Sequence, residues 1–317
     1  IWIRWMIGAM QNPIPYQKDR PIIRIRPMKG TSCKICTHEL SSEPVLEINK
    51  PDRFEAFIGV DEKSFKRTWH RCSSCAVLQA VHYNGMDEKL AQISDKYYSI
   101  DFGSLTSGSR FERIQKIPDE KSDNYHRVRR IGDFYRNWIQ SFEKSSTPSI
   151  LDIGGGMGVF LCKYLEVNPD FTGVMIEPDR ESTTHIDSSF PFEFHNRLFS
   201  GQEEYQRDFD IVTLNKVVEH IEKPHQLLSD IQKVLNKKHG LLYIEIPDEM
   251  NVYYKPSSDN SLGSLHHHLY NPHSLNYLLE STGYTVLRIE RMFEASGKIS
   301  IYAFAISSIA EKQWLTH

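Results

Sequence analysis

Four of the five residues at 154–158 are glycine, in the stretch LDIGGGMGVF, and Asp152 lies just ahead of them. The order D-x-G-G-G-x-G differs from the G-x-G-x-x-G spacing of dinucleotide pyrophosphate sites, and no G-K-[ST] follows as in a phosphate loop. A second acid, Glu177, ends the run VMIE about twenty residues later, where a carboxylate can accept hydrogen bonds from both ribose hydroxyls. The pattern predicts a ribose-containing ligand against the backbone. The alternative is a tight strand-to-helix turn followed by an acidic helix start.

Two histidine-containing stretches further along the chain could supply a general base. VVEHIEKP contains Glu219 and His220, and SLHHHLYNPHSL contains three consecutive histidines. A hydroxyl group or an enolisable carbon must lose a proton when it attacks an electrophile, and imidazole titrates close enough to neutrality to take it. We therefore interpret His220, His266 and His268, together with Glu219, as candidate catalytic residues. For His220 the alternative is an exposed or helix-capping side chain, and for the triple histidine it is a solvated loop.

Four of the five cysteines form two C-x-x-C pairs, CKIC and CSSC, with residues 37–71 between them. Disulfides belong mostly to small secreted domains. Two C-x-x-C pairs instead let four thiolates close around one tetrahedral zinc ion at about 2.3 Å per bond, with no coordination position left open. We therefore expect a structural zinc site, and its ligands would be Cys33, Cys36, Cys72 and Cys75. Reduced core cysteines or a redox pair are the alternatives.

Strands and helices alternate through the C-terminal half of the chain and would position these residues. Apolar runs predict strands at 149–153, 171–177, 209–215 and 240–247, and amphipathic stretches predict helices at 160–167, 178–186, 224–235 and 271–283. Two final runs, 285–292 and 298–307, are close enough to form an antiparallel hairpin at one edge. This alternation indicates a mostly parallel sheet covered on both faces. Ligands of such sheets bind at the carboxyl ends of the strands, where the glycine turn and the histidine stretches fall.

We divide the chain into an N-terminal arm (1–28), a zinc-binding module (29–100), a linker with an amphipathic helix (101–147) and a C-terminal domain (148–317). The module contains predicted strands at 45–48 and 76–83. In NYHRVRRIGDFYRNWIQSF, apolar residues recur every three or four positions, which predicts a helix whose basic outer face is a solvated charge stripe. Tyr97 and Tyr98 could close over a ligand as part of a lid, or they could form an interdomain contact.

The motifs LDIGGGMG, VMIEPD, FDIVTLNKVVEHIEKP and LLYIEIPD together resemble those of class I S-adenosylmethionine-dependent methyltransferases, over roughly residues 148–307. The resemblance implies an α/β, Rossmann-like, doubly wound sheet of seven strands whose last strand is antiparallel. It also implies that the glycine turn borders the methionine part of the donor and that Glu177 holds the ribose. Many such enzymes have an acid for the adenine near the third strand; here the stretch reads HNRLFSG, so the backbone at 196–198 could serve. The implied donor-binding residues are Asp152, Gly154, Gly155, Gly156, Glu177, Pro178, Asn196, Leu198 and Asn215.

A narrower resemblance connects the cysteine pairs with the histidines. Methyltransferases of sugars and related small molecules carry an N-terminal four-cysteine zinc module, followed by a tyrosine-containing segment like KYYSIDF. The carbon-methylating members that act on nucleotide-linked deoxysugars have a histidine after the fourth strand and a Y-H-E-H-like cluster after the fifth. His220, His266 and His268 match these histidines by position, while Leu265 and His267 replace the tyrosine and the glutamate. The resemblance implies methyl transfer to a carbohydrate or related small polar acceptor, and it leaves carbon and oxygen methylation equally open.

Charge and hydropathy limit the other classes of function. The net charge is −3 and the pI is near 6.6, so a broad electrostatic attraction to nucleic acid is not implied. No apolar run approaches the length of a membrane span, and we expect a cytoplasmic protein. The expected ligands are S-adenosylmethionine, a structural zinc ion and a small-molecule acceptor such as a sugar or nucleotide sugar, with no nucleic-acid or membrane partner.

Three alternatives stay open. Some ribosomal RNA methyltransferases also carry an N-terminal zinc module, and the basic arm and RVRR would suit RNA, although no N-P-P-[YF] motif is present. A non-catalytic binding protein could retain the same fold. Metal binding by Glu219, His220 and a later histidine would be similar to methyltransferases with an E-x-x-E-H motif. Because Lys216 stands at the first glutamate position, we expect no complete site of that kind.

Overall fold

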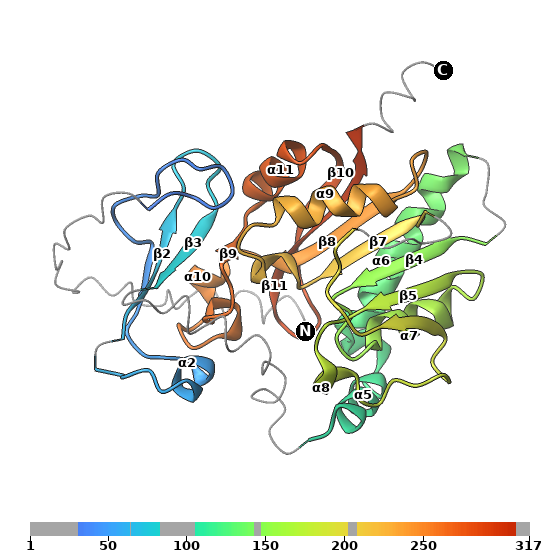
Figure 1. The fold of residues 1–317 in the computed structure, drawn as a ribbon, viewed down its shortest axis with the longest axis horizontal. Coiled ribbons are helices and arrows are strands. Elements are labelled where there is room, and N and C mark those ends of the chain that lie inside the picture. Colours follow the sequence, from blue (N-terminus) through green and yellow to red (C-terminus); the bar gives the residue numbers. More distant parts are fainter. Residues whose placement is uncertain (1–30, 64, 83–104, 143–146, 202–207, 309–317) are drawn as a thin grey trace, which may run out of the picture. The chain divides into compact units, whose positions relative to one another are not determined.

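A seven-stranded sheet lies in the C-terminal half of the chain, in the strand order β10-β11-β8-β7-β4-β5-β6 (Figure 1). The computed structural model describes residues 31–63, 65–82, 105–142, 147–201 and 208–308. Neighbouring strands from β6 to β8 pair in parallel, whereas β11 is antiparallel to both β8 and β10. This confirms the predicted Rossmann-like sheet with an antiparallel last strand. Its strands are β4 (Ser149–Ile153), β5 (Thr172–Ile176), β6 (Phe192–His195), β7 (Ile211–Asn215), β8 (Leu241–Pro247), β10 (Tyr284–Phe293) and β11 (Ile299–Ser307).

Helices cover both faces of this sheet. Side chains of α6 and α7, such as Val128 and Leu161, pack with Ile150 on one face. Side chains of α9 and α11, such as Leu228, pack with Leu151 on the other face. Ile150 and Leu151 separate in this way because consecutive residues of a strand point to opposite faces. The helices are α5 (Ser107–Gln115), α6 (Asp123–Trp138), α7 (Val159–Val167), α8 (Arg180–Thr183), α9 (His225–Val234), α10 (Asn251–Tyr254) and α11 (Pro272–Ser281).

A second, four-stranded antiparallel sheet belongs to the cysteine module and has the order β1-β2-β3-β9. Its small core contains Trp69 and Leu78, which pack with Leu262 and Leu269 from the segment that follows β8. The module therefore completes its sheet with a strand that lies far along the sequence. The remaining elements are β1 (Leu46–Ile48), α2 (Arg53–Phe57), β2 (Arg67–Arg71), β3 (Leu78–His82), β9 (His268–Leu269) and the 3₁₀ turns η2 (Asp119–Lys121), η3 (Ile139–Ser141), η4 (Val218–His220) and η5 (Asn260–Leu262).

The basic face of α6 differs from the predicted solvated stripe. Arg127 is 7% exposed, and its Nε donates to Glu245 Oε2 over 2.9 Å. Arg130 donates to the same carboxylate over 3.1 Å and to Tyr243 Oη over 2.6 Å. The prediction was wrong for these two arginines because Glu245, fully buried in β8, needs cations to balance its charge. Both guanidiniums in turn hold the pKa of Glu245 below its usual range, against the effect of its burial.

The predicted elements of the large sheet are present with small changes in length. The sequence pattern did not predict the strands β2, β6 and β9. The predicted helix at 178–186 is shorter, since α8 covers only Arg180–Thr183. The N-terminal arm and the tyrosine pair Tyr97 and Tyr98 lie outside the described residues, so the domain boundaries stay predictions. Within the described part of the chain, no helix is both long and apolar enough to cross a membrane.

Candidate functional site

The glycine turn connects β4 with α7 and leaves no room for side chains. Gly154 has a φ of 71°, and a Cβ there would lie 2.6 Å from Val217 Cγ2. A Cβ on Gly155 would lie 2.5 Å from Met175 Cγ and 2.9 Å from Asp152 Oδ2. Glycine is required at both positions, because real Cβ atoms do not approach other atoms so closely. The turn therefore packs directly on β5 and on the loop that follows β7.

Asp152 lies under this turn with one oxygen paired and the other unpaired. Its Oδ1 accepts hydrogen bonds from Thr213 Oγ1 at 2.6 Å and from Asn215 Nδ2 at 3.0 Å. Neither Asp152 Oδ2 nor Asn215 Oδ1 has a hydrogen-bond partner among the described residues. Burial raises the pKa of Asp152 to about 7. An unpaired buried carboxyl oxygen costs free energy until a ligand donor or cation reaches it.

Glu177 follows β5 and borders the same turn. Its Oε2 accepts a hydrogen bond from the Gly156 N–H at 2.9 Å, and its Oε1 accepts one from the Asp179 N–H at 2.9 Å. Burial raises the pKa of Glu177 above its usual range. Asn196, after β6, donates through Nδ2 to the carbonyls of Glu177 at 2.9 Å and Pro178 at 3.1 Å. The ends of β4, β5 and β6 are thus joined by hydrogen bonds through these residues.

His220 and His266 form a pair at the neighbouring strand end, after β7. Their ring centroids are 4.6 Å apart with an edge-to-face arrangement. His220 Nδ1 lies 3.0 Å from the Leu265 carbonyl oxygen, and His266 Nδ1 lies 2.8 Å from that of Ser261. Because a carbonyl only accepts, each Nδ1 carries the hydrogen and each Nε2 carries the lone pair. Burial lowers the pKa of His220 to about 4 and that of His266 well below its usual value, so both rings are neutral near pH 7.

Glu219 completes a three-residue cluster with this pair. One ligand atom from each of Glu219, His220 and His266 lies within 4.8 Å of the others. Glu219 is 1% exposed, neither carboxylate oxygen has a hydrogen-bond partner among the described residues, and burial raises its pKa to about 8. His268 is apart from this cluster: it is fully buried in β9, its ring faces Tyr270, and burial lowers its pKa to about 3.

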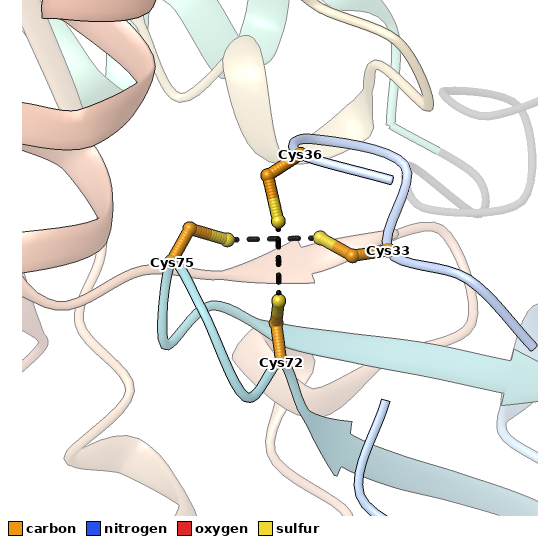
Figure 2. Close-up of side chains that lie close together, drawn as sticks. All are labelled: Cys33, Cys36, Cys72 and Cys75. Atoms are coloured by element: carbon orange, nitrogen blue, oxygen red, sulfur yellow. Dashed lines mark hydrogen bonds between the residues drawn. The ribbon is translucent and has the colours of Figure 1, made fainter. Parts of the chain in front are cut away.

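The four predicted cysteine ligands point their sulfurs at one another (Figure 2). The Sγ atoms of Cys33 and Cys75 are 3.6 Å apart, and those of Cys36 and Cys72 are 3.3 Å apart, so no disulfide links them. Four zinc–sulfur bonds of about 2.3 Å at tetrahedral angles would place the sulfurs about 3.8 Å apart. The spacing of the four sulfurs therefore fits one zinc ion.

The backbone of each C-x-x-C pair has the same conformation. The residue after each pair has a left-handed backbone, with φ of 66° at Thr37 and 60° at Ala76. In each pair a backbone N–H points at the first sulfur over 3.4 Å, from Ile35 to Cys33 and from Ser74 to Cys72. Such N–H groups stabilise a thiolate, the form that binds metal.

The cysteine module contacts the histidine loops directly. The Ala80 N–H of β3 donates to the His267 carbonyl over 2.9 Å, and the His267 N–H donates to the Glu219 carbonyl over 2.8 Å. Lys34, inside the first C-x-x-C pair, forms an ion pair with Glu222 at 2.8 Å. The loop that carries His266 is therefore bonded to β3, and the segment that carries Glu219 and His220 is linked to the module through His267 and through the Lys34–Glu222 ion pair.

Comparison with known families identifies the larger domain. The sequence model of a family described as a methyltransferase domain matches residues 124–289, just over half of the chain. The chain belongs to this methyltransferase family. The match includes the glycine turn, Glu177 and the cluster of Glu219, His220 and His266. Together with this site, family membership makes the protein an S-adenosylmethionine-dependent methyltransferase.

No curated protein matches this methyltransferase, but many solved structures share its fold. One is the plantazolicin methyltransferase BpumL in complex with a desmethyl-plantazolicin analogue and SAH, at 14% identity and a TM-score of 0.47, covering 63% of this chain and 89% of that one. The glycopeptide N-methyltransferase MtfA, complexed with S-adenosyl-L-methionine, has 10% identity, a TM-score of 0.41 and coverages of 55% and 92%. The N-methyltransferase NodS from Bradyrhizobium japonicum has 13% identity, a TM-score of 0.38 and coverages of 56% and 94%.

A buried ionic network beside the cluster was missed by sequence reasoning. Lys216 lies at the point where β7 ends and has a left-handed backbone, with a φ of 60°. The Nζ of Lys216 lies 2.7 Å from Glu294 Oε1 and donates to Ser300. The backbone N–H of Lys216 donates to the Glu245 carbonyl over 2.7 Å. The signal was an acid inside the apolar run LLYIEIP, because a charge in a central strand requires a cation nearby.

Proposed function

We propose that this methyltransferase transfers the methyl group of S-adenosylmethionine to a hydroxyl or an acidic carbon of a carbohydrate or related small polar acceptor. The observation that carries the proposal is the His220–His266 pair, whose rings are 4.6 Å apart on loops next to the glycine turn. Val217, three residues before His220, fills the space that a Cβ on Gly154 would need, so the base and the donor turn are neighbours. The carbohydrate class comes from the resemblance of the cysteine module and the histidine positions.

The donor is held, in this proposal, at the carboxyl ends of β4 and β5. The unpaired oxygen of Asp152 accepts from the cationic amino group of the methionine part, and Glu177 accepts from the ribose hydroxyls. The absence of side chains at the glycine turn lets the ligand contact the backbone. Leu198 is 75% exposed at the end of β6, where its backbone and that of Asn196 can border the adenine. The full set is Asp152, Gly154, Gly155, Gly156, Glu177, Pro178, Asn196, Leu198 and Asn215.

The acceptor loses its proton to an imidazole of the histidine pair. The sulfonium makes the methyl group electrophilic, so the protein's task is alignment and proton removal. His220 and His266 each keep Nε2 as the basic nitrogen, because their Nδ1–H groups are held by carbonyls. Above about pH 8, where Glu219 is ionised, its charge would stabilise the imidazolium that forms. His268 is the weaker candidate for the base, since it is fully buried within a strand.

The four cysteines bind one structural zinc ion in this proposal. Such a site has no open position, so the ion stabilises the module and takes no part in methyl transfer. The module spans residues 29–100, followed by a linker with an amphipathic helix (101–147) and the methyltransferase domain (148–317). An N-terminal arm of residues 1–28 precedes it.

A donor-consumption assay tests this function. Purified protein is incubated with labelled S-adenosylmethionine and, in separate reactions, with nucleotide sugars, polysaccharide fragments and RNA. Methylated carbohydrate is the expected product, and its loss in His220→Ala with unchanged donor affinity would support the histidine role. Labelled RNA in place of carbohydrate would contradict the acceptor class, and absence of donor binding would favour a non-catalytic protein.

A further inference from the structure

The carboxylate of Glu219 has no counter-charge bonded to it. It is 1% exposed, and both of its oxygens are without a hydrogen-bond partner among the described residues. The nearest lysine in sequence, Lys216, directs its ammonium instead to Glu294 and Ser300. A buried carboxyl group without a hydrogen-bond partner is unfavourable whether it is ionised or protonated. Both oxygens of Glu219 are therefore open to a ligand donor or a cation that is not among the described residues.

The two histidines are oriented as metal ligands are. Ligating histidines almost always donate their other ring N–H to a carbonyl or a carboxylate, which fixes the tautomer and the ring orientation. His220 does so to the Leu265 carbonyl, and His266 does so to the Ser261 carbonyl. Both carbonyls come from the segment between β8 and β9, so one loop orients both rings.

We propose that Glu219, His220 and His266 bind one divalent transition-metal ion. One ligand atom of each lies within 4.8 Å of the others. Bonds of about 2.0–2.2 Å would require these atoms to move to about 3 Å from one another. Two imidazoles and one carboxylate leave coordination positions open, as in other two-histidine, one-carboxylate sites. The expectation that Lys216 leaves no complete E-x-x-E-H site still stands, because this set has three ligands and lacks the first glutamate.

The ion would act on the acceptor, so this inference rests on the proposed function and deepens it: with the Nε2 atoms of both histidines bound to the ion, the ion takes over the proton removal that the proposed function gives to an imidazole. An acceptor hydroxyl bound to the ion is more acidic, because the cation stabilises the alkoxide. Its proton passes to solvent, the oxygen lone pair forms a bond to the donor's methyl carbon, and the carbon–sulfur bond breaks with its electron pair kept by sulfur. In the metal-free protein, an imidazole takes the same proton. The cysteine site differs from the Glu219–His220–His266 site in two ways. Its thiolate ligands favour zinc, and four of them leave no coordination position open.

Manganese(II) binding tests the site, because this ion prefers oxygen and nitrogen ligands to thiolates. Full-length protein with zinc in the cysteine site is titrated with Mn²⁺ and followed by electron paramagnetic resonance. About one ion per chain should bind, and histidine ring signals in NMR spectra of the unsubstituted protein should broaden. Glu219→Gln and His266→Asn should each weaken binding by more than about tenfold, at least the loss seen for residues behind a ligand. Glu280→Gln and His273→Asn, two substitutions of exposed residues of α11 outside the cluster, should leave it unchanged.

Absence of Mn²⁺ binding, or equal binding by the cluster variants and the controls, overturns the inference. Donor affinity and thermal unfolding verify that each variant is folded, and the line broadening needs no variant at all. Carbohydrate methylation is measured separately. If the protein methylates carbohydrate but binds no ion in the cluster, the metal site is contradicted and the proposed function is supported. If Mn²⁺ binding depends on the cluster but no carbohydrate is methylated, the metal site is supported and the proposed acceptor is contradicted.

Discussion

The proposed donor side and the proposed acceptor side of this methyltransferase are built in different ways. The donor side, which our proposal places at the ends of β4 and β5, comes from one short stretch of sequence and the acid that follows it. The acceptor side joins η4 to a loop more than forty residues later. That loop is hydrogen-bonded to β3 of the cysteine module, and Glu222, just after η4, forms an ion pair with Lys34 of the module. The comparison teaches that donor chemistry depends on local backbone geometry, whereas acceptor chemistry depends on contacts between distant segments. A substitution on one side should therefore impair either donor binding or acceptor turnover, but not both.

The largest separation should come from the cysteine cluster. Cys72→Ser removes one of four thiolates, so zinc content should fall from about one ion per chain to near zero, and the thermal midpoint should fall because metal binding contributes to folding. Acceptor turnover should be lost with the order of the module, while calorimetric donor affinity should change less, because Asp152 and Glu177 form their hydrogen bonds with β7, the glycine turn and the loop after β5 rather than with the module. Cys162→Ser, outside the cluster in α7, is the matched control. Equal loss of donor and acceptor functions would contradict the separation.

Removing the base should affect turnover alone. We expect His220→Ala to lower kcat about 10²–10⁴-fold, the usual contribution of a positioned base, with donor affinity unchanged. His273→Ala, an exposed histidine at the start of α11, should retain full activity. Steady-state kinetics and calorimetry on the same preparations make the comparison. Full activity of the His220 variant would rule out this residue as the base.

Glu177→Ala should produce the reverse pattern. Loss of charge-assisted hydrogen bonds to the ribose should weaken donor binding by about 1–3 kcal/mol. At saturating donor, kcat should change little, because the acceptor cluster is untouched. Glu181→Ala, an exposed acid on the neighbouring helix α8, controls for charge. An unchanged calorimetric affinity would refute the ribose role.

The strand, the turn and the acid of the proposed donor side could be predicted from the sequence because they are contiguous, while their role in donor binding stays a prediction. LDIGGGMG, followed by Glu177, fixes a strand, a turn and an acid within one strand–helix–strand unit, and the structure has these elements at the predicted residues. The clustering of the paired cysteines could also be predicted, because the two members of each pair are close in the sequence. Each C-x-x-C pair forms a local turn, so only the meeting of the two pairs required the fold.

The residues of the proposed acceptor side could be predicted only in part from the sequence, because their positions depend on pairing between distant strands. His266 and His268 are two residues apart, yet one joins the cluster and the other is buried in β9, and only the pairing of β9 with β3 decides between them. The partners of Arg127 on α6 could not be predicted either. A basic residue on an amphipathic helix normally faces solvent, and Glu245 lies more than a hundred residues away.

The last expected effect is a pH dependence that arises at Asp152. Burial raises the pKa of Asp152 from 3.8 to about 7, so the folded protein keeps this proton over a range in which the unfolded chain has lost it. Stability therefore falls as pH rises from about 4 to about 7, and the cost of the buried charge is complete above pH 7. Asp152→Asn removes that cost and should raise the thermal midpoint relative to the parent above about pH 7. Because the ionised form attracts the donor's ammonium, parental donor affinity should rise between about pH 6 and about pH 8, and that of the variant should stay flat. Calorimetry at both pH values checks this, and a parental affinity that does not change with pH would place the ammonium elsewhere.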